Sequence, residues 1–176
     1  RYCVSLPFKP EAITPLNNYE AARVRFLALE RSLNRNPDRK SVYMIEMSKY
    51  IDAGHVELVD SNDLQGDEAF YLPHHPVIKE GHESHALRIV FEGSATDHRG
   101  TSLNSSLLPG PALQTDLADV LLRFRSQAIG LTGDVSKMFL QIEIESSHRD
   151  WLRFLWREPG SNNSLRCYRF TRLPFG

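Results

Sequence analysis

The sequence predicts an α+β fold, in which helices lie on a mostly antiparallel sheet. Within residues 1–54, apolar side chains recur at helical spacing. After Gly54 the pattern changes to short runs rich in β-forming residues, separated by polar turns. The chain has 176 residues and 41% hydrophobic content, enough to bury a core of ordinary domain size. We therefore expect one domain, or one domain and part of another.

Two helices are expected to lead the chain. The first begins at Tyr19, after Asn18, which is available as its N-cap. Asn36 and Pro37 end this helix and begin the second, because Asn caps well and Pro is tolerated at the first helical position. Gly54 is a plausible stop for the second helix. The apolar stripe of the first helix consists of Tyr19, Ala22, Phe26, Leu29 and Leu33.

Most of the remaining chain is predicted to form strands. A Gly-, Ser-, Asn- and Pro-containing connection at 93–111 is expected to be irregular, with one short helical turn. A further helix is expected to begin behind Thr115 or Asp116, with Leu117, Val120, Leu121 and Phe124 on one face. The predicted strands are 55–59, 70–79, 86–92, 128–134, 140–144, 151–157 and 165–171.

A lone carboxylate stands at the end of one of these strands. Residues 131–142 read LTGDVSKMFLQI, and Asp134 follows the apolar part of this run. Desolvating an unpaired carboxylate costs several kcal/mol, so such a group usually has a charged partner or a cation. Asp134 is therefore a candidate metal ligand. Alternatively, it begins a turn or caps the next helix.

The same run resembles the first catalytic motif of reverse transcriptases. That motif has an Asp, an aromatic residue at plus five and Gln-Ile at plus seven and plus eight, and these positions hold Asp134, Phe139, Gln141 and Ile142 here. Other segments resemble the polymerase region of BEL/Pao-type LTR retrotransposons and occur in the expected order: YLPHHPVI at 71–78, LRIVFEGS at 87–94, SLN at 102–104, GPALQ at 110–114 and LLRFR at 121–125. The opening RYCVSLPFK and the NNY at 17–19 resemble the stretch that precedes that polymerase.

The resemblance implies a division of the chain and an activity. Residues 1–54 would be a helical lead-in, 55–112 the fingers, and 113–176 a partial palm that stops within the second palm motif, at LPFG. The family is an RNA-directed DNA polymerase, which performs nucleotidyl transfer with deoxynucleotides and two divalent cations, Mg²⁺ or Mn²⁺. Its partners would be an RNA or DNA template-primer, deoxynucleotides, and the rest of a polyprotein with palm, thumb and RNase H. The family is intracellular, in cytoplasmic virus-like particles.

The resemblance also assigns roles to single residues. Asp134 would be the catalytic carboxylate and metal ligand, and the backbone carbonyl of Val135 would add an oxygen. Phe139 would pack under the incoming sugar and exclude a 2′-hydroxyl; alternatively, it is a core aromatic at a strand start. Arg88 would contact the triphosphate through its forked guanidinium, or it is a plain exposed strand residue. The remaining nucleotide-binding candidates are Gln141, Lys79, Phe175 and, as a helper, His85.

Two features depart from the family pattern. Glu92 and Gly93 stand where the family more often has Asp-Ala. No Asp-Asp pair occurs in the 176 residues, although a reverse transcriptase needs an aromatic-x-Asp-Asp turn to complete its metal site. Two function classes therefore remain: a fragment of a polymerase that is inert alone, or a non-catalytic retroelement remnant or nucleic-acid or protein interaction module.

Charge, cysteine and histidine content add smaller constraints. The net charge is −1, but residues 147–176 hold six Arg against Asp150 and Glu158, which could line a phosphate-tracking surface or form a solvated strand face. Cys3 and Cys167 lack zinc-site spacing and do not indicate a disulfide scaffold. No apolar run approaches the ~20 residues of a membrane span. His74, His75, His82 and His85 cluster within twelve residues. A zinc site there would lack supporting Cys and would need Glu83 as a weak fourth ligand, so we expect these histidines at turns and on strand surfaces instead.

Overall fold

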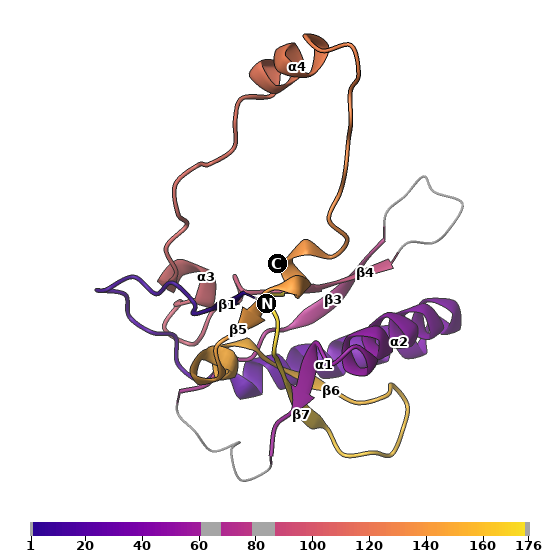
Figure 1. The fold of residues 1–176 in the computed structure, drawn as a ribbon. Coiled ribbons are helices and arrows are strands. Elements are labelled where there is room, and N and C mark those ends of the chain that lie inside the picture. Colours follow the sequence, from indigo (N-terminus) through magenta and orange to yellow (C-terminus); the bar gives the residue numbers. More distant parts are fainter. Residues whose placement is uncertain (1, 61–67, 79–86, 175–176) are drawn as a thin grey trace.

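A computed structural model describes residues 2–60, 68–78 and 87–174. Helices and strands follow one another in a mixed order, and most of them gather in one body (Figure 1). In chain order the elements are β1 (Cys3–Val4), α1 (Tyr19–Asn34), α2 (Pro37–Asp52), β2 (Val56–Leu58), β3 (His74–Ile78), β4 (Leu87–Phe91), α3 (Leu103–Ser106), α4 (Leu117–Arg125), the 3₁₀ helix η2 (Met138–Gln141), β5 (Glu143–Ile144), the 3₁₀ helix η3 (Ser146–Leu152), β6 (Arg153–Trp156) and β7 (Arg166–Phe170).

The strands pair mostly in the antiparallel sense, which confirms the α+β prediction in its coarse form. One sheet has the order β2-β7-β6, and a second consists of β3 and β4; both are antiparallel. In the β3–β4 pair, His74 lies opposite Phe91 and Ile78 lies opposite Leu87. The short pair β1–β5 is parallel. Because β2 pairs with β7, the end of the second helix lies beside the last described strand.

The two leading helices have the predicted limits. The Asn36 side chain accepts a hydrogen bond from the backbone N–H of Arg39 at 3.0 Å, so it caps α2 as expected. Gly54 follows α2 with φ of +64°, a conformation that favours glycine. Asn18 precedes α1, but its side chain makes no capping bond. Its amide instead bonds the backbone of Tyr71 on the neighbouring segment.

A single aromatic-rich core joins the helices to both antiparallel sheets. Phe91, Phe154 and Phe170 pack edge to face or tilted, with ring centroids 4.7 to 5.4 Å apart. Tyr43 of α2 is fully buried in the same cluster, where its ring packs against His74 and Trp156, and Phe26 of α1 also belongs to it. On β4, Leu87, Ile89 and Phe91 are buried while Arg88 is exposed, so one face of the strand packs on the core. Most of the buried aromatic rings of the described residues thus share this core, whereas Tyr71 lies in a smaller second cluster with Ala22, Val59, Ala69, Leu155 and Cys167.

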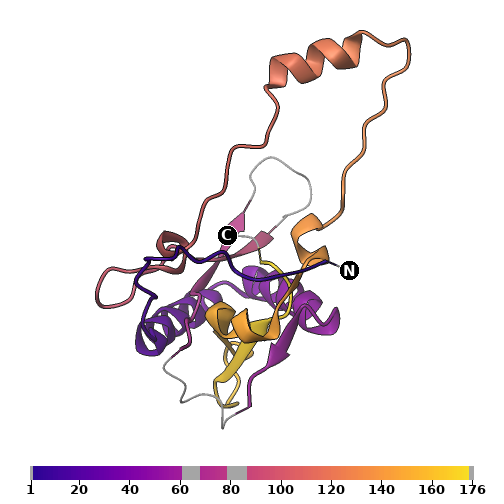
Figure 2. The same cartoon turned by 60° about the vertical axis from the view of Figure 1, so that its left-hand side comes forward.

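One segment stands away from this body. We call residues 109–137 the arm; every residue in it is exposed. The arm carries α4 at its far end, and two long irregular stretches connect α4 to the body in both views (Figures 1 and 2). Asp116 caps α4 by accepting from the backbone N–H of Ala118 at 2.8 Å, as the sequence predicts.

One predicted strand is wrong and another is only partly right. Residues 128–134 have no regular structure, because a strand needs a hydrogen-bonding neighbour and no described segment provides one beside the arm. Residues 140–144 are only partly a strand, since η2 covers Met138–Gln141 and β5 holds two residues. The turn into η2 uses Lys137, the one non-glycine residue with positive φ among those described, at 50°.

Both cysteines are free in the structure. Cys3 is exposed, and Cys167 is buried. Burial raises the pKa of the Cys167 thiol to about 11. Within the described ranges, no helix has the length and apolar character that crossing a membrane requires.

Candidate functional site

Asp134, the predicted catalytic carboxylate, lies on the return stretch of the arm. It is exposed, and so are its neighbours on both sides. The side chain of Val135 is 60% exposed. Asp134 therefore does not end a buried strand. The desolvation argument that made it a metal candidate does not hold for the chain in this conformation.

The other residues of the predicted motif follow at the base of the arm. Phe139 is in η2 and is 39% exposed, so it is not the core aromatic of the alternative interpretation. Leu140, beside it, is buried and anchors η2 to the body. The Gln141 side chain donates to the backbone carbonyl of Ser136 at 3.4 Å. This bond spans Lys137, so it supports the left-handed turn that separates the arm from the body.

The predicted triphosphate contact comes from a different element. Arg88 lies on β4, opposite Val77 of β3, with its side chain exposed. This exposed position is compatible with either prediction for Arg88, a phosphate contact or an ordinary surface residue, and does not distinguish between them. Lys79, His85 and Phe175, the other predicted nucleotide contacts, lie outside the described residues.

Glu92, one of the departures from the family pattern, joins two parts of the body. Its carboxylate accepts from Arg25 of α1, and His75 Nδ1 lies 2.7 Å from the same carboxylate oxygen. Burial opposes ionisation of Glu92, but Arg25 and His75 outweigh it and lower the pKa of the carboxyl group. Gly93 packs against the Asn104 side chain so closely that a Cβ atom would collide with it. The pair Glu92-Gly93 thus has a local structural role.

The histidine prediction is wrong for His74. This residue is buried in the aromatic core, where its ring packs against Phe91, Phe154 and Trp156. Its Nε2 donates to the backbone carbonyl of Leu155 at 2.9 Å, and its Nδ1 pairs with the Tyr43 hydroxyl. Alternation along β3 places His74 inward, a direction that the sequence HHPVI leaves open. Both ring nitrogens are occupied, so His74 cannot bind zinc.

The arginines of 147–176 are mostly paired with carboxylates. Arg169 contacts both Glu57 and Asp150, at 2.7 and 3.0 Å. Arg153, 2% exposed, contacts Asp150 at 2.8 Å. Burial opposes ionisation of Asp150, but these two arginines lower its pKa. The arginines in ion pairs are Arg149, Arg153, Arg157, Arg169 and Arg172. Five of the six arginines are thus paired with four carboxylates, Glu30, Glu57, Glu143 and Asp150, which weakens the case for a phosphate-tracking surface.

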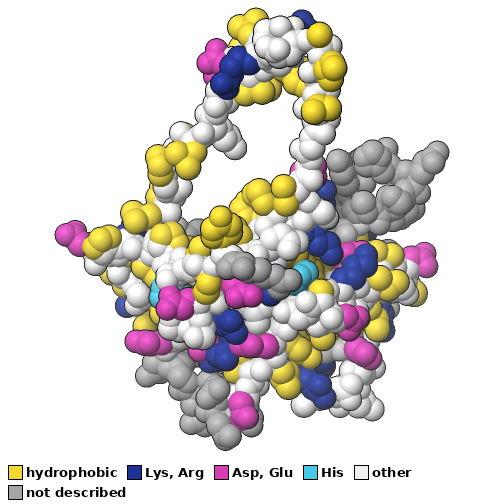
Figure 3. All heavy atoms as spheres, in the orientation of Figure 1, with side chains coloured by type: hydrophobic (Ala, Val, Ile, Leu, Met, Phe, Trp, Pro, Cys, Tyr) yellow, Lys and Arg dark blue, Asp and Glu magenta, His cyan; other side chains and the backbone are white. Residues whose placement is uncertain are grey.

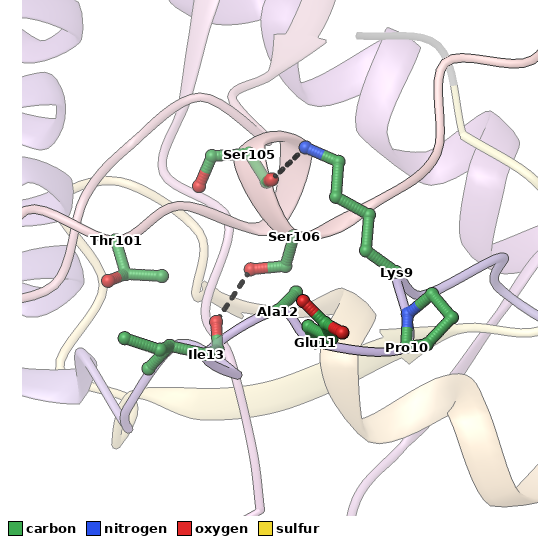
Figure 4. Close-up of a pocket in the computed structure, with 8 residues that line it drawn as sticks. All are labelled: Lys9, Pro10, Glu11, Ala12, Ile13, Thr101, Ser105 and Ser106. Carbon is green, nitrogen blue, oxygen red and sulfur yellow. Dashed lines mark hydrogen bonds between the residues drawn. The ribbon is translucent and has the colours of Figure 1, made fainter.

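An open pocket of about 560 Å³ lies between the N-terminal segment 9–13 and the residues Thr101, Ser105 and Ser106 (Figure 4). Lys9 Nζ donates to the backbone carbonyl of Ser105 at 2.7 Å, and Ser106 Oγ donates to that of Ile13 at 3.0 Å. These bonds hold the N-terminal segment against α3. None of the predicted site residues within the described ranges lines this pocket.

The donor set does not fit a two-cation centre. Across residues 2–60, 68–78 and 87–174, no group of three or more His, Cys, Asp or Glu side chains is placed to hold a metal ion. A two-metal site needs several carboxylate oxygens around ions roughly 3.5–4 Å apart. Asp134 on an exposed arm supplies one carboxylate. The described residues therefore hold at most part of such a site.

Comparison with known proteins adds no assignment. The chain matches no protein-family model, and no curated protein is significantly similar to it.

Proposed function

We propose that this chain is the fingers and early palm of an RNA-directed DNA polymerase of the BEL/Pao retrotransposon type. In this proposal Asp134 is the first catalytic carboxylate, and the chain is inactive until further palm residues complete the site. Template-primer, deoxynucleotides and Mg²⁺ or Mn²⁺ are then properties of the completed polymerase. The rest of the polyprotein is the partner.

One observation carries this proposal. Asp134, Phe139, Gln141 and Ile142 match all four positions of the polymerase motif, and the other matching segments surround it in the expected order. An isolated Asp or Phe would carry little weight, because both residue types have common structural roles. The joint spacing over nearly the whole chain is much harder to obtain by chance.

The exposed arm is compatible with this assignment. Nucleotidyl transfer depends on positioned charge and on carboxylates around the reacting phosphate. A carboxylate on an exposed segment is not positioned, so it needs additional structure before it can act. An exposed arm is also compatible with the second candidate, a non-catalytic remnant in which the rest of the polymerase that would contact the arm has been lost.

A polymerase assay separates the two candidates. A polypeptide extended with a remaining palm that carries the x-Asp-Asp turn should incorporate deoxynucleotides on a primed RNA template. Asp134→Asn should abolish incorporation, because the amide loses the charge that a hard cation prefers. Asp119→Asn, on the same arm but outside the motif, is the matched control and should retain activity. Full activity of Asp134→Asn would refute the assignment.

A second variant tests the role of Phe139. Replacing the ring by the smaller side chain in Phe139→Val should open room for one oxygen and admit ribonucleotides. The measurement is the ratio of ribonucleotide to deoxynucleotide incorporation in the extended polypeptide. Met138→Val changes an adjacent half-exposed residue, which is 48% exposed, and should leave the ratio unchanged. An unchanged ratio in Phe139→Val would remove this residue from the proposed site.

A further inference from the structure

The loop between β6 and β7 and one side of α2 enclose a second pocket, of about 160 Å³. A cavity of roughly 150 Å³ is large enough for a molecule the size of benzene. The pocket is lined by apolar, neutral polar and charged side chains, and it shares no residue with the polymerase motif. The apolar lining is Met44, Ile51, Trp156 and Tyr168, and the neutral polar lining is Ser48, Asn163 and Ser164.

Two regular elements carry much of this lining. Met44, Ser48 and Ile51 are four and three residues apart on α2, so they follow one side of the helix. Trp156 of β6 lies opposite Arg166 of β7, and cross-strand partners of this kind share one face of the sheet. Side chains on helices and strands are placed more precisely than side chains on loops, which suits a binding site.

The loop that borders the pocket is held by its own hydrogen bonds. Arg157 Nη1 donates to the backbone carbonyl of Asn163 at 3.2 Å. Ser161 donates to the Glu158 carbonyl through its Oγ at 2.7 Å and through its backbone N–H at 3.1 Å. The turn between them uses Gly160 at φ of +81°, a conformation that favours glycine. A loop that is ordered in advance loses less entropy when a ligand binds.

The pocket offers a ligand one charge of each sign. On the face of the body in Figure 3, basic and acidic side chains are interspersed, without an extended surface of one sign. The pocket has the same mixture on a small scale. Arg157 is already paired with Glu30, at 2.8 and 2.9 Å. Arg166 and Glu158 also line the pocket and are exposed, and neither side chain forms a hydrogen bond or an ion pair with another described residue.

A ligand that matches this lining has a carboxylate, an ammonium group and a small apolar part. We propose that the pocket binds a free α-amino acid with a small apolar side chain. Its carboxylate pairs with Arg166, because a guanidinium can donate two parallel hydrogen bonds to a carboxylate. Its ammonium group donates to Glu158 and to the side-chain oxygen of Asn163. Its apolar side chain packs on Trp156, and valine, somewhat larger than benzene, has a suitable size.

Titration of the 176-residue chain with L-valine tests this inference, followed by calorimetry and by tryptophan fluorescence, since Trp156 lines the pocket. Binding should be saturable, with a dissociation constant in the millimolar range that a small ligand allows. Isovalerate lacks the ammonium group and isobutylamine lacks the carboxylate. Each should bind at least about tenfold more weakly than L-valine, because one charged group of the pocket is then left without its partner.

Two variants link each charge of the ligand to one residue. Arg166→Gln and Glu158→Gln should each weaken L-valine binding at least about tenfold. Arg166→Gln should also lose the preference for L-valine over isobutylamine, and Glu158→Gln the preference over isovalerate. Arg31→Gln is the matched control, an exposed arginine of α1 outside the pocket, and should bind L-valine like the unchanged chain. Circular dichroism checks that each variant is folded.

Several results would overturn the inference. They are the absence of saturable L-valine binding up to tens of millimolar in both measurements, isovalerate binding as tight as L-valine binding, full binding by Arg166→Gln, and an equal loss of binding in Arg31→Gln. None of these readouts depends on polymerase activity, so they leave the proposed function separately testable.

Discussion

His74 is held as a neutral imidazole in the middle of the aromatic core. A backbone carbonyl can only accept, so Nε2 carries the proton in the bond to Leu155. Nδ1 is then the acceptor for the Tyr43 hydroxyl. Burial is the main cause that lowers the pKa of His74 to about 4, from an ordinary value of 6.5. The bond from Nε2 to the Leu155 carbonyl opposes this shift but does not outweigh burial.

The lowered pKa predicts a stability that depends on pH. Between about pH 6.5 and pH 4 the unfolded chain binds a proton at His74 that the folded chain does not. The free energy of unfolding should therefore fall as the pH is lowered through this window, by up to about 3 kcal/mol from this residue. Urea unfolding at several pH values measures it. The dependence should shrink in His74→Gln but persist in His98→Gln, where the histidine is exposed. Equal dependence in both variants would contradict the prediction.

Asn18 provides a second residue-scale prediction. It is 6% exposed, its Nδ2 donates to the Tyr71 carbonyl at 2.9 Å, and its Oδ1 accepts from the Tyr71 N–H at 2.7 Å. Asn18→Ala leaves two buried backbone groups unpaired and should cost about 2–4 kcal/mol of unfolding free energy. Asn17→Ala should cost less, because Asn17 is exposed and its side chain accepts from the Tyr19 N–H only two residues away. Chemical denaturation compares the two variants, and equal losses would be contrary to this account.

The sequence placed Asn18 beside a helix start but could not reveal its partner, which is 53 residues away. The same limit applies to Glu30, whose carboxylate accepts hydrogen bonds from Nε and Nη2 of Arg157 at 2.9 and 2.8 Å. Helical spacing identifies Tyr19 and Phe26 as an inward stripe because it depends on neighbours along the chain. Long-range polar pairs depend on the packing of separate elements, which a single sequence does not specify.

At the scale of elements, the arm is the part least tied to the rest of the chain. Strong local signals, the Asp116 cap and the apolar face behind it, define α4. The predicted strand at 128–134 needed a neighbour, and the described body supplies none. Local signals therefore predicted the helix correctly and the strand wrongly.

Replacing the arm should leave the body intact. If residues 112–134 are exchanged for a short Gly-Ser linker, no buried side chain is lost, because all of these residues are exposed. The melting temperature of the body, measured by calorimetry at a concentration where the chain is monomeric, should stay within a few degrees of the original, since loop-length changes cost little. A matched control alters a residue of the body instead. Asp97→Ala removes a buried carboxylate that accepts from the backbone N–H groups of Leu16, Arg99 and Thr101. That variant should melt lower. A large fall in the melting temperature on replacing the arm would show that the arm stabilises the body and would contradict the prediction.

At the scale of the whole molecule, the candidate polymerase residues come from two separate segments of the sequence and are divided in space between arm and body. Asp134 lies on the arm, Phe139 at its base, and Arg88 on the β3–β4 pair. Motif spacing proposes these residues as candidates but does not predict their arrangement, because the arrangement depends on how separate elements pack. The coarse fold was predictable, since two helical stripes and alternating strands are local patterns.

Primer extension on an RNA template tests the central claim, that this chain carries one part of a catalytic site and not a whole one. The 176-residue chain is assayed alone and after addition of the remaining palm, with Mg²⁺ and with Mn²⁺. We predict no incorporation by the chain alone and incorporation by the completed polypeptide that disappears in Asp134→Asn. Incorporation by the purified chain alone, or activity of the completed polypeptide without the Asp134 carboxylate, would contradict the account.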